Sequence, residues 1–334
     1  MLSARQLHKQ GLKVKLLEKS GLGQESSWAG GGILSPLHPW RYSDTVNELA
    51  NIGHQVYQQL AAELLDEGGV DPEYIRNGLL ILDSHEQQQA VEWAAQWGRE
   101  LQMIDAADAL QEICPGVSVE YAQGLWMPDV AQMRNPRLVK SARASLDALG
   151  IEYQENTPVE RLLIKNGRIE GVVAGGDEIH ADKVLIAGGA WSAEIMKELV
   201  DVPEIEPVKG QMILFKGSPG ALTRILLAEN RYLIPRKDGR VVCGSTIEHT
   251  GFVKQTSDAV KSELTRSAID IFPQLADMQI EHHWAGLRPG SPNGDPYIGE
   301  HSEVRGLYVN AGHYRNGVIL GIGSAKRIAE IITA

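Results

Sequence analysis

The sequence predicts a mixed α/β fold in which segments of alternating strands and helices are separated by runs of antiparallel strands. Alternating strand and helix patterns occur at residues 1–21, 135–192 and 307–333. Between the second and third of these, residues 206–284 form successive strand patterns with one helix near 257–271. Alternating strands and helices are typical of a parallel sheet, and the inserted strands indicate a second, β-rich domain.

Composition and charge limit the classes of partner. The chain has 334 residues and a formal net charge of −11, which argues against nucleic acid because its binding proteins usually present a basic face. No apolar run reaches the ~20 residues of a membrane span, and Arg5, His8 and Lys9 interrupt any signal-peptide core. The two cysteines, Cys114 and Cys243, lack metal-binding spacing and are expected to be buried thiols. We expect a cytoplasmic protein with no metal, membrane or nucleic-acid partner.

The start of the chain has the pattern of the second half of a dinucleotide-binding unit. Residues 1–10 have helical spacing that Gly11 ends, and residues 13–17 form a short strand followed by Glu18. An acid at the end of the second strand of such a unit bonds ribose hydroxyls, about 20 residues after a glycine-rich phosphate loop. That spacing places the loop upstream of Met1. Glu18 is a candidate cofactor residue, and a solvated surface glutamate is the alternative.

The next elements follow from hydrophobic periodicity. Residues 44–67 carry an apolar stripe with helical spacing and predict a long amphipathic helix. Residues 78–82 predict a strand, and residues 86–101 a second helix with Trp93 and Trp97 in the core.

A second run of strands and helices begins near the middle of the chain. Residues 135–150 predict a helix with proline in its first turn and Gly150 at its end. Three or four short strands follow, and the pair Asn166 and Gly167 predicts a tight hairpin turn between two of them. Residues 181–192 predict a buried strand that enters a helix through a Gly-Gly turn.

Three glycine-bearing turns are candidates for contact with a cofactor. They lie at 26–36 (SSWAGGGILSP), 187–192 (AGGAWS) and 311–321 (AGHYRNGVILG), and the first is too rich in glycine for a regular element. Glycine allows close approach, and free N–H groups at turns and helix starts attract phosphate. A purely structural turn is the alternative for each one alone. Together they predict one extended ligand, such as a nicotinamide or flavin dinucleotide.

Tyr232, Arg288 and Arg315 are the candidates for a substrate site. Arg288 lies in WAGLRPGSPNGDPYIG, which we predict to be an irregular loop because of its glycines and prolines. Arginine offers a bidentate fork for a carboxylate, and a structural brace is the alternative. No GxSxG, HExxH or P-loop motif is present, and His282 and His283 are interpreted as strand residues. A bound redox cofactor is therefore expected to carry the chemistry.

Seven stretches have close counterparts in a known family, in the same order: SSWAGGGILSP, TPVERL, AGGAWS, PVKGQM, YLIPRKDGRVVCGST, WAGLRPGSPNGDPYIG and AGHYRNGVILG. They resemble the glycine oxidases of thiamine biosynthesis, within the D-amino-acid oxidase family of FAD flavoproteins. The resemblance implies an α+β protein with a Rossmann-like FAD-binding domain built from residues 1–71, 132–205 and 285–334. A substrate domain of residues 72–131 and 206–284 would hold a large, mostly antiparallel sheet.

The resemblance also implies which residues contact FAD. Glu18 would bond the adenosine ribose, the backbone of Val159 would contact the adenine side, and Gly188 belongs to the second cofactor turn. The first turn would lie beside the pyrophosphate and flavin, and the start of the last helix would stabilise negative charge on the reduced flavin. The implied cofactor residues are Glu18, Ala29, Gly30, Gly31, Val159, Gly188, Arg315, Asn316, Gly317 and Val318.

On the substrate side, the resemblance implies that Arg288 and Tyr232 bind the substrate carboxylate, with Arg315 nearby. A small amino acid, bound with its amine neutral, would transfer a hydride from Cα to flavin N5 without a side-chain base. O2 would reoxidise the flavin to give hydrogen peroxide, and the imine would serve thiamine thiazole synthesis or hydrolyse to glyoxylate. Ile247 stands where one family member has a methionine lining the pocket, which leaves the exact substrate preference open.

The sequence departs from the family at its start, because the opening strand and the GxGxxG loop would precede Met1. A chain translated as written is expected to bind FAD poorly and to fold marginally. We interpret the departure as a start codon assigned too far downstream, rather than as a degenerate protein.

Three alternatives to an oxidase remain. One is a quinone-linked D-amino-acid dehydrogenase with the same fold. Another is a flavin domain that trims a carboxymethylaminomethyl group on tRNA, against which the acidic balance counts. The last is a cofactor-free remnant that acts only as an interaction protein. The family further implies a homotetramer.

Overall fold

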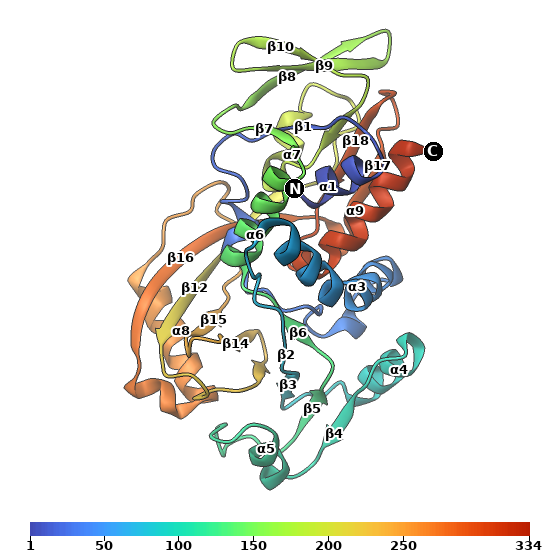
Figure 1. Ribbon diagram of the computed structural model, residues 1–334. Coiled ribbons are helices and arrows are strands. Elements are labelled where there is room, and N and C mark those ends of the chain that lie inside the picture. The colour runs from blue at the N-terminus through green and yellow to red at the C-terminus, as the bar shows by residue number, and fades with distance from the viewer.

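A large sheet of eight strands forms the lower part of the computed structural model, which describes residues 1–334 (Figure 1). In spatial order the strands are β16 (Gln279–Gly290), β12 (Glu206–Lys216), β15 (Val241–Gly244), β14 (Arg231–Pro235), β13 (Ile225–Ala228), β3 (Leu79–Leu82), β5 (Gly124–Met127) and β4 (Gln102–Ile104). All neighbours are antiparallel except β13 and β3. The predicted large, mostly antiparallel sheet is confirmed.

Smaller sheets occupy the upper part of the molecule (Figure 1). Their strands are β1 (Lys15–Leu17), β7 (Glu152–Gln154), β8 (Val159–Lys165), β9 (Arg168–Ala174), β10 (Asp177–His180), β11 (Val184–Ile186), β17 (Tyr297–Glu300) and β18 (Leu307–Ala311). One further pair, β2 (Ile75–Arg76) and β6 (Ala131–Gln132), lies lower in the molecule. Strand β1 pairs in parallel with β7, and β11 pairs in parallel with β18. Parallel pairs thus join segments far apart in the sequence, as the α/β prediction requires. The domain boundaries given above stay a prediction.

Four helices pack together beside the small sheets: α1 (Leu2–Lys9), α3 (Asp44–Gly68), α6 (Asn135–Ala148) and α9 (Gly317–Thr333). The others are α2 (Ser26–Ala29), α4 (Gln87–Trp97), α5 (Ala107–Ile113), α7 (Ser192–Ile195) and α8 (Asp258–Ile271), with short 3-10 turns η1 (Pro39–Arg41), η2 (Gly189–Trp191), η3 (Pro273–Asp277) and η4 (Pro292–Gly294). Helix α3 begins where the Ser43 hydroxyl accepts from the Val46 N–H and ends at Gly69, with φ of 68°.

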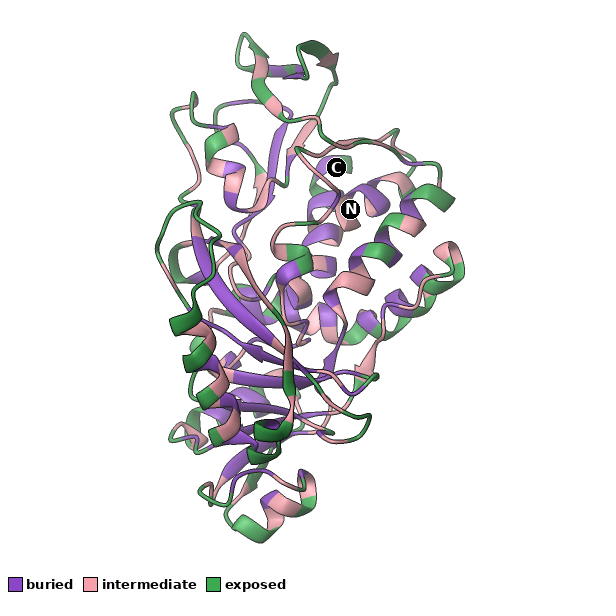
Figure 2. Cartoon of the chain, turned by 90° about the vertical axis from the view of Figure 1, so that its left-hand side faces the viewer, coloured by how far each residue is buried: buried purple, intermediate pink, exposed green.

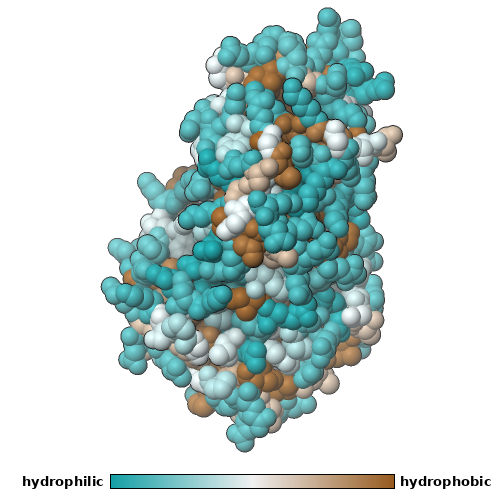
Figure 3. All heavy atoms as spheres, in the orientation of Figure 1, coloured by the Kyte–Doolittle hydropathy of each residue, from teal (hydrophilic) through white to brown (hydrophobic).

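The large sheet separates two cores. In β3, Leu80 and Leu82 face a cluster that includes α8, whereas Leu79 and Ile81 face a cluster that includes Trp93 of α4. Figure 2 shows the strands of this sheet as largely buried. The face of the molecule in Figure 3 is mostly hydrophilic with scattered apolar residues. No helix combines the length and apolar character that a membrane crossing needs.

Two local predictions are wrong. Ser26–Ala29 forms one helical turn, α2, where we predicted only a loop. Arg288 lies in the strand β16 instead of an irregular loop. Strand β16 is at the edge of the sheet and pairs on one side only, with Pro289 opposite Pro207 of β12. An edge position tolerates proline, because the missing N–H would have faced no partner.

The segment from 151 to 192 contains five strands, β7 to β11, instead of three or four. The predicted hairpin between β8 and β9 is confirmed, with φ of 51° at Asn166 and 69° at Gly167. The strand before the Gly-Gly turn, β11, is only partly buried, and α7 beyond it is a single turn.

A buried ion pair joins α1 to α3. The Arg5 side chain is 2% exposed, and its Nη2 lies 2.6 Å from carboxylate oxygens of both Glu63 and Glu67. Glu67 also accepts a hydrogen bond of 2.5 Å from the Ser145 hydroxyl of α6. Burial alone would raise the pKa of Glu67, but the hydrogen bonds from Arg5 and Ser145 outweigh it and lower the pKa from 4.5 to about 2.

Glu67→Gln is expected to reduce the free energy of unfolding at pH 7 by about 3 kcal/mol. Because the folded pKa lies below the unfolded value of 4.5, this stabilisation is present above pH 4.5 and is lost as the pH falls toward 2. Urea unfolding at pH 7 and at pH 3 measures this stabilisation. The difference in the free energy of unfolding between Glu67→Gln and wild type should shrink by more than half at pH 3.

Glu152→Gln is the control, because Glu152 pairs with Lys15 on the surface and is 54% exposed. That change should leave the free energy of unfolding nearly unchanged. Equal losses in the two variants would contradict the assignment of stability to the buried pair.

Candidate functional site

A cavity with a volume of about 320 Å³ lies between β12, β14 and β16 of the large sheet and the helices α1, α6 and α9. The three glycine-bearing turns meet around it. The first contributes Ala29, Gly30, Gly31 and Gly32, the second Ala187 and Gly189, and the third Ala311, His313, Tyr314, Arg315, Gly317 and Val318. The predicted convergence of these turns is therefore present in the structure.

Close packing against protein explains the glycines of the first turn. A Cβ on Gly31 would lie 2.8 Å from Ile234 Cδ1 of β14, and one on Gly30 would lie 2.7 Å from the Asn135 side-chain nitrogen. Gly32 has φ of 85°, and a Cβ there would overlap with the carbonyl oxygen of Met133. The turn is thus held between β14 and the start of α6 while its backbone lines the cavity.

The third turn directs the start of a long helix at the cavity. No side chain caps the N-terminus of α9, and its first residues, Gly317 and Val318, line the cavity. Uncapped N–H groups and the helix dipole attract negative charge. The buried Asn316 side-chain nitrogen beside them has no partner in the protein.

Arg288 supplies a buried positive charge without a counter-charge. Its guanidinium donates to the carbonyl oxygens of Lys209 at 3.3 Å and Thr246 at 3.1 Å and to the Ser245 hydroxyl at 2.6 Å. No carboxylate lies within ion-pair distance, and burial lowers the pKa of Arg288 below its usual value. Arg315 lines the same cavity and makes no ion pair either. Two unpaired guanidinium groups in one cavity form a site for an anion.

The lining of the cavity contains no aspartate, glutamate, lysine or cysteine. Tyr232 contributes its phenol, whose hydroxyl lies 3.6 Å from Met212 Sδ. His313 is the one imidazole, with Nε2 2.9 Å from the Ser324 hydroxyl. Burial lowers its pKa to about 4, so this ring is neutral at neutral pH. The site can bind and orient a carboxylate, but it has no carboxylate, lysine or charged imidazole side chain for acid–base chemistry.

Some predicted site residues lie outside this lining. Glu18 directly follows β1, where its carboxylate accepts from the Ser20 N–H at 3.1 Å, and Val159 begins β8. Ile247 is 44% exposed. The residues that the structure brings together are Ala29, Gly30, Gly31, Tyr232, Arg288, Arg315, Gly317 and Val318, and those that it leaves outside the lining are Glu18, Val159, Gly188, Asn316 and Ile247.

Sequence reasoning missed several residues around the site. Gly210 of β12 lies under the Arg288 guanidinium, and His313 and Asn310 line the cavity. Gly210 lies in the motif PVKGQM and His313 in the motif AGHYRNGVILG. The motifs marked these segments, but they did not indicate the role of either residue. Nothing in the sequence marked Asn135, because its contact with the first turn depends on how α6 packs.

Gly210→Ala is expected to displace the Arg288 guanidinium, because a Cβ at this position would overlap with it. The far end of arginine can move, so folding should be little affected while the KM for a carboxylate substrate rises about 10- to 100-fold. Steady-state kinetics and a thermal unfolding curve measure the two effects. Gly299→Ala is the control, because a Cβ there meets nothing within 4 Å. An unchanged KM in Gly210→Ala would show that Arg288 does not need this position.

The groups around the cavity fit a flavin dinucleotide. Buried polar atoms without partners lie in or beside its lining, namely Asn135 Oδ1, Asn310 Oδ1 and Asn316 Nδ2. Such atoms cost free energy unless a ligand satisfies them. The uncapped start of α9 and the bare backbone of the glycine turns add further N–H donors.

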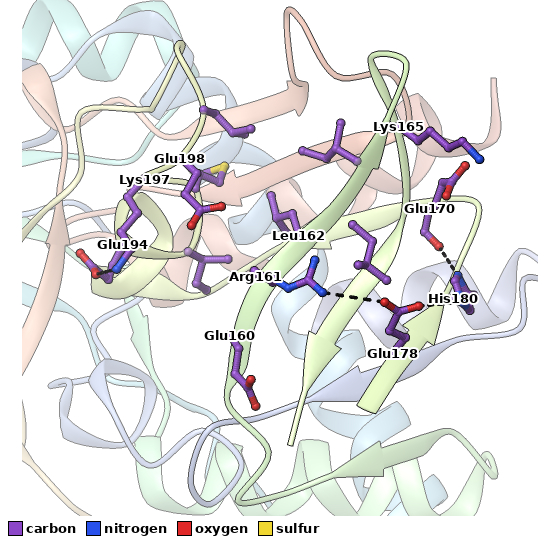
Figure 4. Close-up of a pocket in the computed structure, with 15 residues that line it drawn as sticks. Glu160, Arg161, Leu162, Lys165, Glu170, Glu178, His180, Glu194, Lys197 and Glu198 are labelled. Carbon is purple, nitrogen blue, oxygen red and sulfur yellow. Dashed lines mark hydrogen bonds and ion pairs between the residues drawn. The ribbon is translucent and has the colours of Figure 1, made fainter. Parts of the chain in front are cut away.

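A second cavity, of about 470 Å³, lies between β8 to β10 and the segment around α7 (Figure 4). Several of its charged side chains pair with one another: Arg161 with Glu178 at 3.8 Å, His180 with Glu178 at 3.5 Å and Lys197 with Glu194 at 2.7 Å. None of the glycine turns that meet at the first cavity lines it. This second cavity is therefore not a candidate for the redox site.

Comparisons with known proteins agree with this geometry. The model of the family described as DAO, FAD dependent oxidoreductase, matches residues 1–331. A glycine oxidase of Pseudomonas aeruginosa is 46% identical, with 100% of this chain and 92% of that protein covered. A bifunctional protein ThiO/ThiG of Trichormus variabilis is 30% identical, with 98% of this chain and 50% of that protein covered. The solved glycine oxidase from Bacillus cereus superposes with a TM-score of 0.90 at 30% identity, covering 99% of this chain and 91% of the other.

Proposed function

The chain belongs to the DAO family of FAD-dependent oxidoreductases, and on that premise we propose that it oxidises glycine and other small amino acids. The cofactor of the family is FAD. The observation that carries the proposal is the buried guanidinium of Arg288, which faces the cavity without a carboxylate partner. Similarity to the glycine oxidases of two Pseudomonas species supports the substrate class.

The residues present divide the work between holding a cofactor and holding a substrate. The glycine turns and the start of α9 would hold FAD, which when bound accepts a hydride from the substrate Cα at its N5 atom. Arg288 and Tyr232 fix the carboxylate of the amino acid, so that orientation supplies much of the rate enhancement. His313 is neutral, and no aspartate, glutamate, lysine or cysteine side chain lines the cavity, so we infer that the amine binds in its neutral form.

Oxygen consumption by the purified protein with added FAD and glycine tests the proposal. The expected result is one hydrogen peroxide formed per O2 consumed, with glyoxylate and ammonia as products. Reduction of a quinone or dye without O2 uptake would favour the dehydrogenase instead. A colourless protein that binds no FAD would overturn the proposal in favour of a remnant.

The imine product gives the proposed place in metabolism. Water hydrolyses the imine, so an enzyme that uses the imine as a substrate must take it up directly after it forms. The similarity to bifunctional ThiO/ThiG proteins supports thiamine thiazole synthesis as that use. Restored growth of a thiamine-requiring strain that lacks its own glycine oxidase would test this step. From the resemblance to the glycine oxidase family we also propose a homotetramer, and light scattering tests this assembly.

A further inference from the structure

Arg236 is a second buried arginine that makes no direct ion pair, and it lies outside the cavity lining. It follows β14, and its side chain is 7% exposed. Its Nη2 donates to the carbonyl oxygen of Gly31 at 2.6 Å, while Nη1 donates to Gln132 Oε1 at 2.6 Å and to the Met133 carbonyl at 3.2 Å. All three acceptors are neutral. Burial lowers the pKa of Arg236 to about 10, so the side chain remains a cation at neutral pH.

Holding a loop with a cation that is buried among neutral acceptors costs free energy. Removing a charge from water costs several kcal/mol unless an opposite charge compensates it. An asparagine or glutamine could satisfy carbonyl groups at lower cost. A charged side chain at this position therefore indicates a role beyond packing.

The geometry connects Arg236 to the wall of the cavity. Tyr232, Ile234 and Arg236 alternate along the chain and share one side of the extended segment. A Cβ on Gly31 would meet Ile234 and the Tyr232 ring, and Arg236 bonds the Gly31 carbonyl. One side of this segment thus positions both the first glycine turn and the phenol of the substrate site.

The bond to the Gly31 carbonyl also sets the direction of the next N–H group. The C=O and N–H of a trans peptide point in opposite directions. Because the guanidinium lies outside the cavity lining, the Gly32 N–H points to the other side of the turn, where Gly32 lines the cavity. No carbonyl or side chain of the protein accepts from this N–H. It is a free donor whose orientation depends on Arg236.

We propose that Arg236 is a positioning residue of the FAD site, which holds the first glycine turn so that the Gly32 N–H is presented to the bound cofactor. Its positive charge lies behind the turn with no carboxylate in direct contact, and it also favours electron density on the cofactor. The proposal rests on the cofactor of the family and not on which amino acid is oxidised. FAD binding is measured without substrate, so failure here is distinguishable from failure of the proposed function.

The test compares Arg236→Met and Arg236→Lys with wild type, all as holoenzymes. The FAD dissociation constant comes from flavin fluorescence after dilution, the midpoint potential from anaerobic dye titration, and folding from circular dichroism. Loss of a hydrogen bond from a charged donor predicts FAD binding weaker by about 10- to 100-fold in Arg236→Met. Its midpoint potential should become more negative. Arg236→Lys keeps the charge but reaches fewer acceptors, so it should weaken FAD binding about 10-fold with a potential closer to wild type.

Arg224→Met is the matched control. Arg224 also donates to backbone carbonyls, those of Ile113 at 3.1 Å and Asn77 at 3.4 Å, but it does not line the cavity or touch the glycine turn. It should lose stability with no change in FAD binding or potential. If Arg236→Met does not fold, Arg236→Lys decides the question. FAD binding within twofold of wild type in a folded Arg236 variant would overturn the proposal.

Discussion

Arg288→Ala is expected to raise the KM for glycine on the order of 100- to 1,000-fold while the FAD content of the purified protein stays unchanged. Removing one member of a buried, hydrogen-bonded charge pair costs 2–5 kcal/mol. In this cavity the other member is the substrate carboxylate, since no carboxylate of the protein lies beside the guanidinium. The loss should therefore fall on substrate binding.

Steady-state kinetics and the flavin absorption spectrum measure the two quantities. A carboxylate that is not oxidised, such as acetate, should perturb the flavin spectrum of wild type but not of the variant. Arg224→Ala is the control for removal of an arginine that bonds only carbonyls. Unchanged glycine turnover in Arg288→Ala would show that the carboxylate binds elsewhere, and Arg315 would be the next candidate.

The long helices and the convergence of the three turns were predictable because their causes are local. The stripe of residues 44–67 fixes the buried side of α3 whatever it packs against. Two of the turns follow β11 and β18, which pair in parallel, and turns after parallel strands gather at one edge of a sheet. Both inferences need only spacing and residue type.

The environment of Arg288 was not predictable from spacing. Glycine and proline around it indicate a loop locally, but pairing with β12 makes the segment an edge strand. That pairing places Gly210 under the guanidinium, a relation between residues nearly 80 positions apart that only the register defines. The same holds for Arg236, whose bond to Gly31 crosses from the large sheet to the first turn.

The glycines of the first turn also have a cause that the sequence did not show. Their pattern predicted close approach of a cofactor, with a structural turn as the alternative. The structure gives the packing reason in full, because side chains at Gly30, Gly31 and Gly32 would meet Asn135, Ile234 and Met133. The turn is shaped by the protein on one side, and this shaping is what leaves its backbone bare on the cavity side.

Gly32→Ala is therefore expected to have the largest effect of any small substitution near the site. Gly32 has φ of 85°, which disfavours any side chain, and its Cβ would overlap with the backbone carbonyl of Met133. Backbone cannot move aside as a flexible side chain can. We expect a loss of at least ~3 kcal/mol in the free energy of unfolding, because overpacking adds to the backbone strain. FAD binding should be lost with it, since the turn must shift.

Gly176→Ala separates the two causes. Gly176 has the same φ of 85°, but a Cβ there meets nothing within 4 Å. It should therefore lose only the ~1–2 kcal/mol of left-handed strain and retain full FAD binding. Urea unfolding and flavin absorbance of the two variants measure the difference. Similar losses in both would mean that conformation alone explains the glycine, and retention of FAD by a folded Gly32→Ala protein would mean that the turn does not shape the cofactor site.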